Sequence, residues 1–115
     1  MSEALHGTVT LMIGARTYTL QPTLDAALRI ESRFGGLRGA LESLRMLSIA
    51  ACADVVIAGA GLKPEEHTQV ASQVFETGVA KVANGLTEYV TGLLNPVPPG
   101  LVERGKPGAA ANTAP

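Results

Sequence analysis

Glu31 is the residue whose surroundings come nearest to those of a functional group. It lies on the half-apolar stripe of the segment PTLDAALRIESRFGGL (residues 22–37), shortly before the Gly35–Gly36 pair. A carboxylate that acts in general acid–base catalysis needs its reacting group within hydrogen-bond reach, usually beside another titratable group. The sequence places no second carboxylate or base beside Glu31. We therefore interpret the segment as a helix with its stop signal, and Glu31 either as a rim residue paired with Arg38 or Arg45 or as a contact for a partner.

The other reactive side chains are isolated in the sequence. His6 and His67 lack the spacing of metal ligands, and no C-x-x-C or H-x-x-x-H pattern occurs. Cys52 lies on an apolar stripe, which is typical of a buried structural thiol rather than a nucleophile. His67 follows Glu65 and Glu66 in the first turn of a predicted helix, where we expect a surface histidine.

The glycine clusters FGGLRG and GAGL do not form a phosphate-binding loop. Such a loop needs a strand before the glycines, a helix after them and a fixed spacing, and both clusters follow predicted helices. We interpret them as helix ends and turns. The sequence therefore predicts no catalytic, metal-binding or cofactor-binding residue, and we expect a protein that is not an enzyme.

The elements that hold these residues begin with a hairpin over residues 8–20. Two alternating runs flank the Gly14–Ala15 pair, which favours a type II′ turn with a positive φ at Gly14. At Pro22–Thr23 the spacing of apolar residues changes from every second residue to about every 3.6 residues. This pattern predicts about five packed helices over residues 24–94. Thr23 is the expected N-cap of the first helix and Gly35 its left-handed stop.

The first and the central helix carry the clearest apolar patterns. In the first, one predicted stripe is widened by two further apolar residues. The stripe consists of Leu24, Ala27, Leu28 and Glu31, and the widening residues are Ile30 and Phe34. The helix near residues 47–60 is apolar nearly all round, so we expect it to be the most buried.

The predicted fold class is α+β, mostly α. We expect residues 1–95 to form a single globular domain and the Pro-, Gly- and Ala-rich residues 96–115 to form a flexible, disordered tail. Aromatic residues make up only 3% of the chain, so the core must consist mainly of small aliphatic side chains.

Charge and segment composition exclude several classes of partner. Nine Lys and Arg residues balance ten Asp and Glu residues without a basic run, which disfavours a nucleic-acid partner. The longest apolar stretch, MLSIAACADVVIAGAGL, contains Asp54 and falls short of a membrane span. The start of the chain lacks the pattern of a signal peptide, and a single cysteine fits a reducing cytoplasm.

The order of these features resembles that of small gene-transfer-agent and tailed-phage proteins grouped as tail assembly chaperones, which also bear the name phage tail tube protein. The resemblance implies a non-enzymatic protein of the bacterial host cytoplasm, transiently present in the assembling tail, that coats the tape-measure protein and assists tail-tube assembly. The family has no known catalytic residues, so none are transferred. The resemblance covers residues 7 to about 94 and is carried by the hairpin, Pro22–Thr23, Ile30–Glu31, Gly35–Gly36, a helix ending near Gly59–Gly61, and Gly78 between two helices.

Two functions are compatible with this resemblance, a chaperone and a structural component of the tail tube. Tube subunits stack through continuous β-sheet, which requires many strands, whereas a chaperone needs apolar helical surface to cover a partner helix. One hairpin and about five helices favour the chaperone and leave the structural role as the alternative. A helix-turn-helix regulator is disfavoured, because the helices are Ala-rich and nearly neutral.

The expected partner is the tape-measure protein, with the major tail protein as a second candidate. A chain this short buries its apolar surface incompletely, so we expect apolar surface near the two C-terminal helices and the hairpin to contact another chain. Formation of a homo-oligomer is the competing outcome. For Phe75 two roles are possible from the sequence, a contact residue for the partner and an ordinary core residue. The candidate partner-binding residues are Phe75, Leu86, Tyr89, Val90, Leu93 and Glu31.

Overall fold

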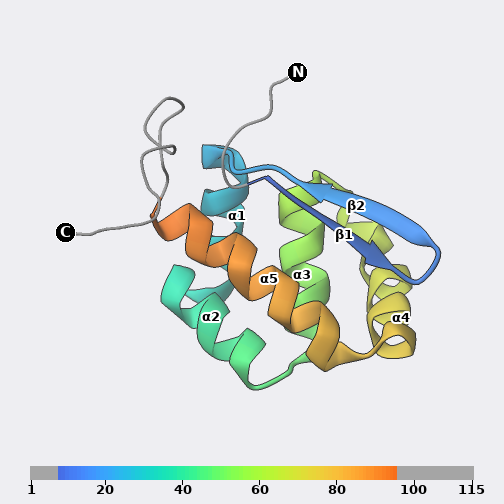
Figure 1. The fold of residues 1–115 in the computed structure, drawn as a ribbon. Coiled ribbons are helices and arrows are strands. Elements are labelled where there is room, and N and C mark those ends of the chain that lie inside the picture. Colours follow the sequence, from blue (N-terminus) through green and yellow to red (C-terminus); the bar gives the residue numbers. More distant parts are fainter. Residues whose placement is uncertain (1–7, 96–115) are drawn as a thin grey trace, which may run out of the picture.

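The computed structural model describes residues 8–95 and has an N-terminal antiparallel hairpin followed by five helices (Figure 1). The predicted fold class is therefore confirmed as α+β, mostly α. The predicted tail, residues 96–115, lies outside the described residues. The elements are β1 (Val9–Ile13), β2 (Arg16–Leu20), α1 (Leu24–Phe34), α2 (Leu37–Arg45), α3 (Ile49–Ala60), the 3₁₀ turn η1 (Pro64–Glu66), α4 (His67–Thr77) and α5 (Val79–Leu94).

The hairpin has the predicted two-residue turn. Its register runs from Val9 opposite Leu20 to Ile13 opposite Arg16, and Gly14 takes a φ of 68°. The inner face, which carries Ile13 and Leu20, packs against α3 and α5. Two strands bury too little surface to be stable alone, so the helices beneath supply the apolar partner that the hairpin needs.

The tip of the hairpin is attached to α4. The Gly14 amide donates to Thr77 Oγ1 at 2.6 Å, and the Tyr18 hydroxyl donates to Gln73 Oε1. These two hydrogen bonds bridge segments more than fifty residues apart in sequence. They fix the position of the hairpin against α4, while its inner face covers α3 and α5.

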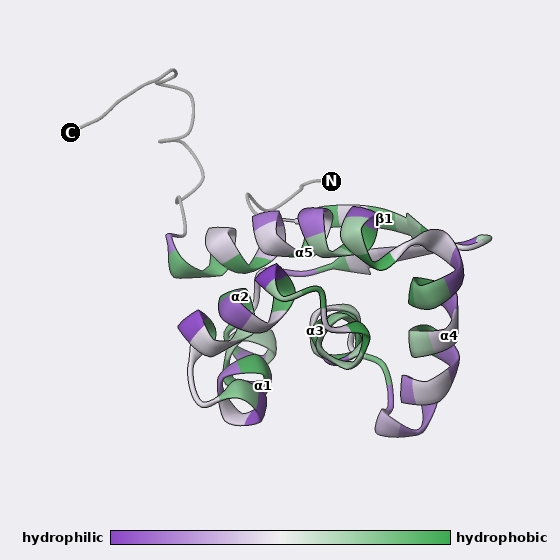
Figure 2. Cartoon of the chain, turned by 90° about the horizontal axis from the view of Figure 1, so that it is seen from below, coloured by the Kyte–Doolittle hydropathy of each residue, from purple (hydrophilic) through white to green (hydrophobic). Residues whose placement is uncertain are grey.

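Helix α3 is the centre of the fold, as its all-round apolar sequence predicts. Figure 2 shows it end-on, with α1 and α2 on one side, α4 on the other, and α5 with the hairpin along a third. Ser48 accepts a hydrogen bond from the Ala51 amide at 3.1 Å and begins the helix, and Gly61, with a φ of 68°, ends it. Asp54 is the only charged residue in this helix.

Helix α1 begins and ends where predicted, but its predicted stripe is wrong. Thr23 caps the helix by accepting from the Ala26 amide at 3.1 Å, and Gly35 ends it with a φ of 74°. Ala26 and Ile30 face the core, whereas Leu24 and Leu28 are exposed. Glu31 lies on the same outward face, so turning the two leucines inward would also bury an unpaired carboxylate.

Within residues 8–95, no helix is both long enough and apolar enough to cross a membrane.

Candidate functional site

The structure separates the six predicted partner-binding residues. Leu86, Tyr89 and Val90 are fully buried against α3 and the hairpin, so the prediction that they form an exposed apolar surface is wrong. The Tyr89 hydroxyl donates to the Gln21 carbonyl, which satisfies its polar atom within the core. Burial raises the pKa of Tyr89 to about 12. Leu93 is half-buried beside this cluster.

Phe75 and Glu31 lie on the surface but at different places. The Phe75 side chain is 71% exposed on α4, so the alternative that it is plain core is wrong. Glu31 is exposed on α1 and forms no ion pair with Arg38 or Arg45 within the part of the chain that the structure describes. Because α1 and α4 lie on opposite sides of α3 (Figure 2), these two residues do not share one contact surface.

An apolar groove between α2 and α5 is a candidate contact site for a helical partner. It has a volume of about 330 Å³. Leu44 and Ala83 are buried in it, and the Thr87 hydroxyl is already satisfied because it donates to the Ala83 carbonyl at 2.8 Å. The lining residues are Leu41, Leu44, Arg45, Leu47, Ala80, Ala83, Asn84, Thr87 and Thr91.

The α5 side of the groove uses a face that the sequence reasoning did not select. Ala80, Ala83, Thr87 and Thr91 follow one another at helical spacing, and their short side chains leave room above the backbone. The prediction favoured the large side chains of α5, which the fold uses as core. Short side chains on the neighbouring face were the available signal, because such residues let another helix approach closely.

Leu47 stands at the rim of the groove in a strained conformation. Its φ is 60°, which makes it the only non-glycine residue with a positive φ among residues 8–95. Its amide donates to the Leu44 carbonyl at 2.9 Å, and the Ser48 amide donates to the Ser43 carbonyl at 3.2 Å. This is the Schellman arrangement, in which glycine usually occupies the left-handed position.

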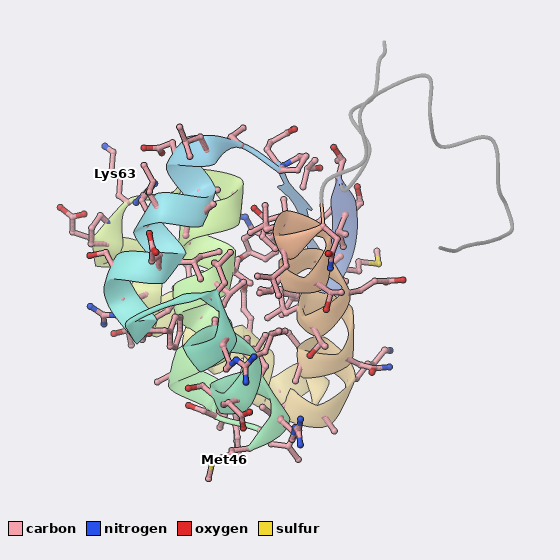
Figure 3. All side chains as sticks on the ribbon, turned by 90° about the vertical axis from the view of Figure 1, so that its left-hand side faces the viewer. Met46 and Lys63 are labelled. Carbon is pink, nitrogen blue, oxygen red and sulfur yellow. The ribbon has the colours of Figure 1, made fainter. Side chains whose placement is uncertain are left out.

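Two apolar side chains are exposed at this turn. The Leu47 side chain is 47% exposed, and its neighbour Met46 is more exposed still. A left-handed conformation costs a non-glycine residue roughly 1–2 kcal/mol. Figure 3 shows Met46 projecting from the turn between α2 and α3, at the opposite end of the fold from Lys63.

A second, polar cleft of about 200 Å³ lies near Lys63, between α1, α3 and the start of α4. Asp54 is mostly buried there, with Oδ2 3.2 Å from Arg33 Nε and Oδ1 3.1 Å from His67 Nε2. The His67 side chain is 33% exposed, so it lies at the surface as predicted, but its Nε2 faces Asp54 instead of water. Asp54 within an otherwise apolar helix was the sequence signal for this contact.

The arrangement does not assemble a recognisable catalytic or metal centre among the described residues. Burial raises the pKa of the Cys52 thiol to about 11, so the thiolate is scarce at neutral pH. No group of three or more His, Cys, Asp or Glu side chains in residues 8–95 is placed to hold a metal ion. No protein-family model matches this chain, and no curated protein or solved structure matches it.

Proposed function

We propose that this protein is a non-enzymatic tail assembly chaperone of a gene transfer agent or tailed phage. It holds an apolar helix of the tape-measure protein in the groove between α2 and α5, and it acts in the bacterial host cytoplasm with transient presence in the assembling tail. The proposal joins the resemblance carried by residues 7 to about 94 to the geometry of this groove. The major tail protein is the second candidate partner.

The observation that carries the proposal is Leu47. A glycine in its place would complete the same turn without strain, yet a large apolar side chain is held half-exposed at the rim of an apolar groove. Strained backbone of this kind persists where the surrounding structure enforces it, and it often marks a binding site. The Leu47 side chain is thus available to cover an apolar residue of a partner.

The lining also indicates the chemistry of the partner. A helix that lies in a groove presents large apolar side chains at positions i, i+3 or i+4, and i+7. Arg45 lines the groove and forms no ion pair with another residue in the range 8–95. A partner helix with an acidic residue beside its apolar stripe would therefore match both features.

A structural role in the tail tube is the alternative. A tube wall built from continuous β-sheet needs several strands in each subunit. Residues 8–95 contain one sheet of two strands, and the hairpin tip is attached to α4. These features favour the chaperone.

The proposal is tested by filling the groove. Asn84→Trp places a large ring over the groove from an exposed position, so the fold should persist while binding is lost. Glu88→Trp is the matched control, because Glu88 is exposed on the same helix outside the lining. In co-expression with the tape-measure protein, the wild type and the control should keep that protein soluble, whereas Asn84→Trp should not.

A second variant separates binding from folding. Leu47→Gly should raise the free energy of unfolding by about 1 kcal/mol, because glycine relieves the positive φ. The same change should weaken binding roughly tenfold or more, as expected for an anchor side chain. If both variants still keep the tape-measure protein soluble, the proposal that the groove binds it is wrong. Hollow tubes of wild-type protein would instead support the structural role, and a dimer abolished by Asn84→Trp would identify a second copy as the occupant.

A further inference from the structure

The polar cleft between α1, α3 and the start of α4 carries more positive than negative charge. Arg29 and Arg33 line it from successive turns of α1, and Asp54 is the only acidic residue in its lining. With His67 neutral, the lining has one positive charge in excess. Ile57, Ala58 and Pro64 complete the lining.

Pairing with Asp54 uses only part of the positive charge and hydrogen-bond donors in the cleft. The carboxylate needs a cation because its side chain is only 14% exposed, and Arg33 supplies one through Nε at 3.2 Å. The contact uses one edge of the guanidinium. Among the contacts within residues 8–95, the two terminal nitrogens of Arg33 have no ion-pair partner. Four N–H donors of Arg33 therefore remain for a ligand.

Arg29 is held by weak contacts. Its two terminal nitrogens lie 4.0 Å from Asp25 Oδ2 and 3.4 Å from the Leu62 carbonyl oxygen, to which the second donates. The Asp25 side chain is mostly exposed, so water screens that ion pair strongly. Arg29 can exchange these contacts for a better acceptor at little cost.

His67 supplies the third group. Its Nε2 lies 3.1 Å from Asp54 Oδ1, but it has no aligned hydrogen bond although the atom is enclosed. An enclosed ring nitrogen without a hydrogen-bond partner is costly. His67 lines the cleft, and a small rotation of its ring would bring this nitrogen to a ligand oxygen there.

We propose that this cleft binds a single oxyanion, a carboxylate or a phosphate group. Arg29 and Arg33 donate to it directly, since the guanidinium fork matches both groups geometrically. Asp54 orients Arg33 and at the same time competes with the ligand for its charge. The proposal is independent of the groove and of the tail-assembly function.

The test is a titration of the full chain with inorganic phosphate and, separately, with acetate, at constant ionic strength. The Arg Nε–Hε signals are followed by ¹H–¹⁵N NMR. The signals of Arg29 and Arg33 should shift and saturate with a Kd of about 1 mM or tighter. Saturation by phosphate alone identifies a phosphate ligand, whereas saturation by both anions includes an acidic side chain of a polypeptide.

Variants distinguish a built site from general attraction to arginine. Arg29→Gln leaves the Arg33–Asp54–His67 contacts intact and should weaken binding at least tenfold. Arg38→Gln, on the exposed side of α2, is the matched control and should change nothing. Asp54→Asn should tighten binding severalfold, because it removes the competing charge.

Three outcomes would overturn the proposal: shifts that stay linear in anion concentration, shifts of equal size at Arg38, or unchanged binding by Arg29→Gln. Should Asp54→Asn fail to fold, the Arg29→Gln and Arg38→Gln pair still decides the matter. Weaker binding by a folded Asp54→Asn variant would show that Asp54 is not a competitor.

Discussion

The inner face of α5 and the outer face of α1 carry similar apolar patterns, but the first is buried and the second is exposed. On α5, Tyr89 and its neighbours Leu86 and Val90 are fully buried, whereas on α1 the Leu24 side chain is 73% exposed. Each pattern has the spacing of a helix that packs on a core. Apolar spacing thus indicates that a helix has an apolar side, but it does not decide which of two overlapping sides faces inward.

The polar neighbours decide the orientation of α1. With Ala26 and Ile30 inside, Arg33 reaches Asp54 and Glu31 stays in water. Rotating the helix to bury Leu24 would separate the ion pair and desolvate Glu31. On α5 the inner stripe contains no charge, so burial of its largest side chains has no such cost. Three predictions test this contrast.

The largest expected effect comes from the inner face of α5. Tyr89→Ala should lower the free energy of unfolding by about 3–5 kcal/mol, because it leaves a cavity in the core and removes the hydrogen bond to Gln21. Urea denaturation of the wild type and the variant measures the difference. A loss below about 1 kcal/mol would mean that the inner face tolerates its removal as the outer face does.

Alkaline pH should weaken the core, by a smaller amount for each of two buried groups. Burial raises the pKa of Cys52 from 9.0 to about 11 and that of Tyr89 from 10.0 to about 12. Because these pKa values are higher in the folded state, the stabilisation is complete below about pH 9 and is lost as the pH rises towards 12. At about 1.4 kcal/mol for each pKa unit, the loss is roughly 2–3 kcal/mol for each group.

Denaturation at several pH values between about 8 and 11 measures the loss from Cys52 and the first part of the loss from Tyr89. Cys52→Ala is the informative variant, since it should flatten the first part of the decline while keeping a small apolar side chain. An equal decline in Cys52→Ala and the wild type up to about pH 10 would show that the thiol does not contribute.

The smallest effect is expected on the outer face of α1. Leu24→Ser and Leu28→Ser should change the free energy of unfolding by about 0.5 kcal/mol or less, because both side chains are exposed. Thermal or urea unfolding at two protein concentrations is the measurement. A loss above about 2 kcal/mol that grows with protein concentration would show that a second copy covers this face in solution.

Local signals made much of the fold predictable from the sequence. The turn at Gly14, the cap at Thr23 and the stop at Gly35 each depend on residues within a few positions, so residue type alone indicates them. The burial of α3 was also predictable, because apolar residues on all sides leave a helix no face for water.

The candidate sites depend on contacts that no local pattern records. Asp54 and His67 meet only because α4 returns along α3, and the sequence gives no register for that packing. The groove forms because α5 turns its face of short side chains toward α2, and no local pattern indicates this orientation. Leu47 was missed because a left-handed turn is normally recognised by glycine, and here the two flanking helices impose it on a leucine.

Cys52, the only cysteine of the chain, can report how often the core opens. The thiol is fully enclosed in the first turn of α3, so a thiol reagent reaches it only when the surrounding helices separate. When the protein recloses faster than the reagent reacts, the labelling rate is the intrinsic thiol rate multiplied by the population of the open form. Labelling by a thiol reagent therefore reports the opening equilibrium of the native chain in buffer, without denaturant or a substituted residue.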